Sequence, residues 1–71
     1  GMTPASLKSW RKRLGLSQRE AADALGISIN WYGQMEAGFR RGTGEPIKIP
    51  KTVAFSCAWI ALHGGTDPFP A

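Results

Sequence analysis

The 71-residue chain lacks several features that stabilise or anchor other small proteins. Its single cysteine, Cys57, permits neither an internal disulfide nor a cysteine-based zinc cluster. Its most apolar run, residues 53–62, falls well short of the ~20 residues that cross a bilayer. The first four residues form no apolar signal segment. These absences predict a domain held together by helix packing or by a partner chain, and they fit a reducing cytoplasm.

Acidic residues are also scarce. Nine Lys and Arg stand against five Asp and Glu, which gives a formal net charge of +4 and a pI near 9.9. The composition is 42% hydrophobic and 20% charged, which is typical of a globular domain rather than a disordered chain. A chain of this length has one small core and excludes barrels and doubly wound sheets. The positive charge favours a polyanionic partner, either nucleic acid or an anionic membrane surface.

Helix start and stop signals predict an all-α fold with four helices. Thr3 and Pro4 are typical of a helix start, and Ser17 with Glu20 forms a capping-box pattern. Glycines provide the stops. The predicted helices run from Pro4 to about residue 14, from Ser17 to residue 25, from Ile29 to residue 37 and from Pro50 to about residue 63. We expect one domain over residues 1–65, with the helix-turn-helix proper over 17–37 and a C-terminal tail over 66–71.

Residues 39–49 read as a loop, because two glycines and a proline interrupt any helical pattern. Within it, Ile47-Lys48-Ile49 alternates and predicts at most one short extended stretch.

The connection between the second and third helices is very short. Gly26-Ile27-Ser28 is too tight for two antiparallel helices that lie side by side, and it favours a crossing of roughly 90–120°. Small residues, Ala21 and Ala22, allow the close approach that such a crossing needs. We expect the seam between the two helices to contain Leu25, Ile27, Tyr32 and Met35.

At this point the sequence resembles the Cro and phage-repressor type of helix-turn-helix domain, also called the xenobiotic-response-element family. The resemblance covers about residues 7–41 and is carried by Leu16-Ser17-Gln18, Ala22, Leu25-Gly26-Ile27-Ser28 and Met35-Glu36-Ala37-Gly38. It implies a small lambda-repressor-like fold and a transcriptional regulator that binds double-stranded DNA sequence-specifically. The family usually continues with two further helices, whereas this chain has room for one after an unusually long loop.

The resemblance also implies roles for individual residues. Arg11 and Glu36 occupy positions that pair in the family, and this pair fixes how the first and third helices sit together. The third helix would lie in the major groove, with Tyr32, Met35 and Glu36 facing the core. Its other face would present Ile29, Asn30, Gly33 and Gln34. The family's base contacts fall on Ile29, Asn30 and Gln34.

Phosphate contacts are implied around the third helix. The family places one at Gln18, and Ser28 combines helix capping with a second. Arg40 and Arg41 lie in the loop that follows the DNA backbone in this family and are expected to neutralise phosphates. Trp31 has three open interpretations: a core aromatic, a contact to the groove wall, or an anchor for a protein partner. Gly33 marks either a close approach to DNA or a tolerated helix defect.

The fourth helix is apolar on nearly every side, so three short helices cannot bury all of it. The surplus around Phe55, Trp59 and Leu62 predicts a homodimer surface, unless the loop and the tail around Phe69 cover it. Cys57 reads as a small core residue.

Two functions therefore compete. The first is a DNA-binding regulator, a repressor by family likeness, which acts in the cytoplasm at the nucleoid and reads two half-sites as a dimer. The second is a protein-interaction module of antitoxin type that uses the apolar fourth helix. No paired carboxylates, metal cluster, phosphate loop or activated nucleophile points to an enzyme, and we expect no cofactor or metal. A membrane-surface role would need a basic amphipathic helix, for which the first helix is a weak candidate.

Overall fold

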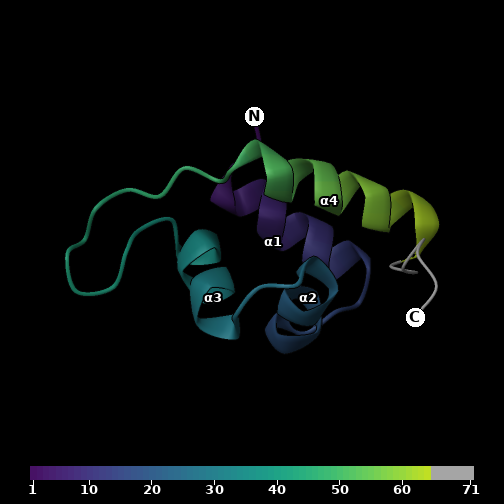
Figure 1. The fold of residues 1–71 in the computed structure, drawn as a ribbon, viewed down its shortest axis with the longest axis horizontal. Helices are drawn as coiled ribbons and strands as arrows, with labels where there is room; N and C mark the ends of the chain where they lie inside the picture. Colours follow the sequence, from purple (N-terminus) through teal and green to yellow (C-terminus); the bar gives the residue numbers. More distant parts are fainter. Residues whose placement is uncertain (65–71) are drawn as a thin grey trace.

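A computed structural model describes residues 1–64 and shows four helices over that range (Figure 1). They are α1 (Pro4–Arg13), α2 (Gln18–Leu25), α3 (Ile29–Ala37) and α4 (Lys51–His63). No strand occurs in residues 1–64, so the predicted all-α class is confirmed. The predicted tail over 66–71, with Phe69, lies outside the described residues.

The helix ends follow the predicted signals. Thr3 and Ser17 cap α1 and α2 with complete capping boxes, in which each hydroxyl accepts a backbone N–H three residues on. Ser28 caps α3 by accepting from the Trp31 N–H at 3.1 Å. Helix α4 begins one residue later than predicted, because Pro50 is its extended N-cap rather than its first helical residue.

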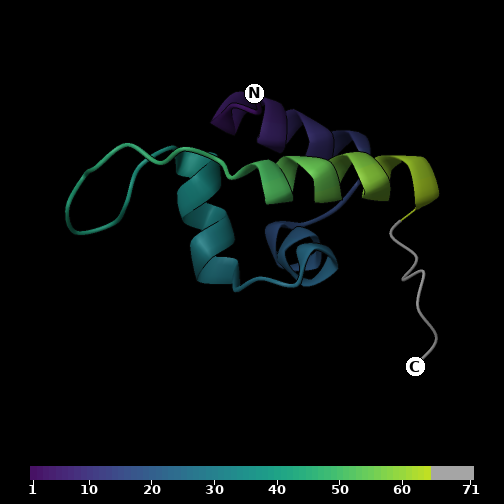
Figure 2. The ribbon, with the colours of Figure 1, turned by 45° about the horizontal axis from the view of Figure 1, so that its top comes forward.

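A single core lies between the helices. Leu7, Trp10, Tyr32 and Met35 are almost fully buried. Helix α4 lies alongside α1 on one side, while α2 and α3 lie on the other (Figure 2). The indole Nε1 of Trp10 donates a buried hydrogen bond of 2.8 Å to the Cys57 carbonyl, which ties α1 to α4. Cys57 is itself buried, as predicted.

The segment between α3 and α4 folds back on itself as a small hairpin-like loop that projects from the helices (Figure 1). Phe39 and Pro46 form an isolated antiparallel bridge, and the Arg40 N–H donates to the Glu45 carbonyl at 2.8 Å. The extended stretch considered for residues 47–49 does not form a strand. Ile49 instead turns into the core, where its side chain is buried.

Candidate nucleic-acid interface

Helices α2 and α3 are joined by a short turn that requires a left-handed backbone conformation at Gly26. Gly26 ends α2 with a positive φ of 71°, which lets the chain leave the helix sharply. The Ile27 N–H then donates to the Ala22 carbonyl at 3.0 Å, and Ser28 starts α3. Ala21 and Ala22 are fully buried beneath this turn. In Figure 2, α3 consequently stands at a steep angle to α2, which is seen nearly end-on.

The inner face of α3 is anchored to α1 by an ion pair. Arg11 Nε donates to Glu36 Oε2 at 2.6 Å, and Arg11 Nη2 donates to Glu36 Oε1 at 3.1 Å. A third bond runs from Arg11 Nη1 to the Leu16 carbonyl at 3.0 Å. This fork geometry holds the guanidinium flat against the carboxylate and fixes the position of α3 against α1.

The surroundings of Glu36 keep it ionised. Burial alone would raise the pKa of its carboxyl, but hydrogen bonds from Arg11, aided by Gln18, outweigh burial and lower the pKa below its usual value. The same bond to Glu36 raises the pKa of Arg11. The Tyr32 hydroxyl is buried without a hydrogen bond to any described residue, and burial first, then the nearby Glu36 charge, raise the pKa of Tyr32.

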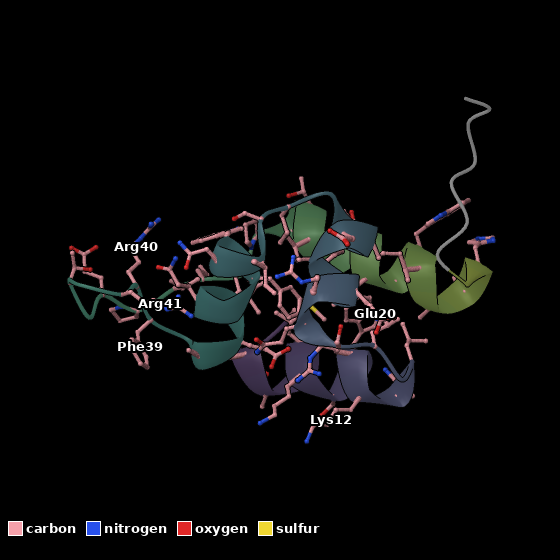
Figure 3. All side chains as sticks on the ribbon, turned by 90° about the horizontal axis from the view of Figure 1, so that it is seen from below. Lys12, Glu20, Phe39, Arg40 and Arg41 are labelled. Carbon is pink, nitrogen blue, oxygen red and sulfur yellow. The ribbon has the colours of Figure 1, made fainter. Side chains whose placement is uncertain are left out.

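The outer face of α3 carries a polar network that involves the following loop. Arg41 Nη1 donates to Asn30 Oδ1 at 2.7 Å, and the Arg41 backbone N–H donates to Gln34 Oε1 at 3.1 Å. Gln34 Nε2 reaches back to the Asn30 carbonyl at 3.4 Å. Figure 3 shows Arg40 and Arg41 together at this end of the molecule. The structure thus brings two residues with predicted base contacts beside one with a predicted phosphate contact.

Arg40 takes a different path from its neighbour. Its guanidinium carbon lies 5.3 Å from the centre of the Trp31 ring, which is a cation–π distance. Trp31 is half-buried and packs against the edge of the core. The structure therefore supports the core interpretation of Trp31 in part. One part of the side chain packs against the core, and the ring also lies beside the basic Arg40.

Gly33 lies on the predicted outer face of α3, but it is not exposed to solvent there, and that part of the prediction is wrong. The residue is buried, because the Arg41 side chain covers it. A Cβ at position 33 would lie 3.2 Å from Arg41 Nη2, which is tighter than an ordinary contact. The mid-helix glycine is thus explained by an arginine of the same chain.

Gln18 and Ser28 lie at the starts of α2 and α3, where backbone N–H groups point outward. The Gln18 side chain donates to Glu36 Oε1 at 3.3 Å, so it links α2 to the buried ion pair. The Ser28 hydroxyl oxygen accepts the Trp31 N–H and keeps its own hydrogen for a further acceptor. Ile29 is exposed at the same corner.

The outer face of α4 is apolar and uncovered by residues 1–64. Its large side chains are exposed to 71% at Phe55, 41% at Trp59 and 81% at Leu62. Trp59 stacks on His63 with ring centroids 3.7 Å apart, which leaves the other side of the indole open. Val53, Cys57 and Ile60 face the core from the opposite side of the helix.

Sequence reasoning missed the link between Arg41 and α3. It treated Arg40 and Arg41 as one phosphate-binding pair, whereas the structure places Arg40 over the Trp31 ring and bonds Arg41 to Asn30. The glycine in the middle of α3 was the signal in the sequence that a side chain covers this position.

The comparisons with known proteins agree with this geometry. The sequence model of a family described as a helix-turn-helix domain matches residues 5–45, more than half of the chain and the segment that holds α1, α2 and α3. Neither the curated proteins nor the solved structures gave a match. None of the described helices is long and apolar enough to cross a membrane. The chain therefore belongs to the helix-turn-helix domain family, of the Cro and phage-repressor type, and this membership points to DNA binding.

Proposed function

We propose that this protein is a sequence-specific transcriptional regulator that binds double-stranded DNA with α3 in the major groove. The observation that carries the proposal is the outer face of α3, where Asn30 and Gln34 lie beside Arg41 and next to Arg40. Amide side chains are suited to base edges, and guanidinium groups are suited to the polyanion around them.

Each end of the helix-turn-helix has a role in this proposal. Ile29 and Asn30 enter the groove first, and Ile29 packs on a thymine methyl group. Gln34 follows one turn later with the free N–H of its amide. The phosphates on either side are held by Gln18, Ser28 and Trp31, together with Arg40. The Arg11–Glu36 pair holds α3 in place from behind and contacts no DNA.

Two copies of the chain are needed to read two half-sites about one helical turn apart. The exposed Phe55, Trp59 and Leu62 support a homodimer through α4, because three large apolar side chains on one face are unfavourable in water. The same exposure favours the alternative function, an antitoxin-type module whose α4 binds another protein.

A salt series with mixed-sequence duplex DNA tests the proposal. The logarithm of the affinity should fall linearly with the logarithm of the salt concentration, by about 0.9 per phosphate neutralised. Replacing Arg40 and Arg41 together by Ala should reduce that slope by about one for each of the two that neutralises a phosphate. A matched control replaces Lys8 and Lys12 of α1 by Ala, which removes the same charge from a different part of the surface (Figure 3).

Equal slopes in the two double variants would contradict the placement of α3 on DNA. Binding weaker than millimolar at low salt would contradict DNA binding itself and favour the antitoxin-type alternative.

A further inference from the structure

Arg41 is placed where a base contact, rather than a phosphate contact, would be made. Its guanidinium is bonded to Asn30 and lies over Gly33, and its backbone N–H is bonded to Gln34. Asn30, Gly33 and Gln34 lie on the outer face of α3, which faces the base edges when the helix lies in the major groove. A phosphate-binding arginine would instead extend from the rim of this face.

The bond to Asn30 also decides which donors and acceptors face outward. Asn30 Oδ1 accepts from Arg41, so the usual pairing of an asparagine with adenine loses an acceptor. Arginine carries five N–H donors and no acceptor, and one of the five points to Asn30. The remaining donors sit on a side chain that is exposed to solvent. Asn30 and Arg41 together therefore present mainly hydrogen-bond donors.

We propose that Arg41 is a specificity-determining residue that reads a guanine in the major groove, with Asn30 as the residue that positions it. The inference rests on the proposed function, because it requires α3 to lie in the groove. Guanine is the base whose major-groove edge offers two acceptors, N7 and O6, whereas adenine and cytosine each offer a donor. A guanidinium can bond both acceptors of guanine at once.

Arg40 provides the internal contrast. It has the same side chain and is adjacent in sequence, but it lies over the Trp31 ring, on the flank of α3. Its guanidinium makes no hydrogen bond to the described part of the chain. Arg40 is therefore suited to a phosphate contact. In this proposal, Arg40 contributes to the affinity for DNA and Arg41 contributes to the sequence specificity.

The test begins with selection of a preferred site from a random duplex library by the wild-type chain. Affinity is then measured for every single base-pair change in that site, with wild type, Arg41→Lys and Arg40→Lys. Lysine keeps the charge but lacks the planar, rigid fork that matches guanine N7 and O6, so its contact to guanine is weaker. We expect Arg41→Lys to lose discrimination at one G·C pair, on the order of 10- to 100-fold. Arg40→Lys should leave the pattern of discrimination unchanged.

A modified base adds a second, independent readout. Replacing the guanine at that pair with 7-deazaguanine removes the N7 acceptor without changing the charge of the DNA. Wild type should bind the modified site more weakly, and Arg41→Lys should lose less affinity than wild type on the same replacement. Thermal melting of each variant checks that the exposed substitutions leave the fold intact.

The failures are distinguishable. If the wild-type chain selects no sequence, the proposed function is overturned. If it selects a site but Arg41→Lys weakens all variants of that site equally, Arg41 is a phosphate contact and the present inference is overturned. Equal sensitivity of wild type and Arg41→Lys to 7-deazaguanine would overturn it as well.

Discussion

The outer faces of α3 and α4 are both open to water, but they are built in opposite ways. On α3, the amides of Asn30 and Gln34 are already bonded to Arg41. On α4, the side chains of Phe55 and Leu62 are largely exposed and contact little of the described chain. A polar face that is internally bonded is stable in water and can exchange its bonds for those of a polar ligand. Exposed apolar area is unfavourable in water, by about 25 cal/mol per Å².

The two faces are also supported differently from behind. Helix α3 is held by a charged contact, in which Glu36 is 5% exposed and Arg11 14% exposed. Helix α4 is held by apolar packing and by the hydrogen bond from Trp10 to the Cys57 carbonyl. The comparison implies that the position of α3, the proposed DNA-facing helix, depends on ionisation, whereas the position of α4, the candidate dimer helix, depends on burial.

Breaking the charged support should give the largest effect on stability. Replacing Glu36 with Gln leaves the largely buried Arg11 without its counter-charge, and we expect a loss of about 3 kcal/mol in the free energy of unfolding. Urea unfolding followed by circular dichroism measures the loss. The matched control replaces both Arg11 and Glu36 with Met, and it should be less destabilised than Glu36→Gln, because no unpaired charge remains. A double variant that is less stable than the single one would show that the pair contributes mainly through attraction.

The apolar face of α4 is the second target. Replacing Phe55 and Leu62 with Glu should weaken the proposed homodimer by about 2 kcal/mol or more, because two large side chains lose their burial in each copy. The monomer should stay folded, since neither side chain belongs to the core. Sedimentation over a range of protein concentrations measures the association. Ser56→Glu, which adds a charge on the same helix away from this face, is the matched control. A wild-type chain that stays monomeric at every concentration would contradict the homodimer.

The contributions of Glu36 behind α3 and of Cys57 in α4 to the stability of the fold should be lost at opposite ends of the pH scale. The pKa of Glu36 is lowered from 4.5 in the folded chain, so its contribution is present above about pH 4.5 and is lost as the pH falls further. Burial raises the pKa of Cys57 from 9.0 to about 11, so its contribution is present below about pH 9 and is lost as the pH rises toward 11.

Unfolding curves at a series of pH values measure both limbs. Glu36→Gln should flatten the acid limb, and it should also change the contribution of Tyr32 to the alkaline limb, because the Glu36 charge helps to raise the pKa of Tyr32. Cys57→Ala should flatten the alkaline limb alone. A Cys57→Ala variant that changed the acid limb would show that the supports of α3 and α4 are coupled.

Local signals predicted the helices well because each helix end is set by nearby residues. Helix α2 begins after the capping box of Ser17 and Glu20 and ends at Gly26, as expected, because a cap acts over three or four positions. The family match over residues 5–45 confirms the helix-turn-helix that these signals framed. The predicted contacts to DNA and to a second chain remain predictions.

The placement of Arg41 could not be predicted from the same signals. Its position depends on how the loop after α3 folds back, and that path is set by contacts such as the bond from the Arg40 N–H to the Glu45 carbonyl. The different partners of Arg40 and Arg41 are therefore evident only in the folded chain.

Replacing Gly33 with Ala should have the smallest effect but gives the sharpest test, because the stability of the fold should rise while the discrimination between DNA sequences should fall. Alanine is favoured over glycine inside a helix by up to ~1 kcal/mol, so Gly33→Ala should raise the free energy of unfolding by a fraction of that amount. The new Cβ would lie 3.2 Å from Arg41 Nη2, and the flexible end of that side chain must shift. We therefore expect weaker discrimination at the guanine proposed for Arg41. In an Arg41→Lys background, Gly33→Ala should still stabilise the fold but should no longer change the discrimination. A chain in which Gly33→Ala weakens binding equally with either residue at position 41 would show that the methyl group itself meets the DNA.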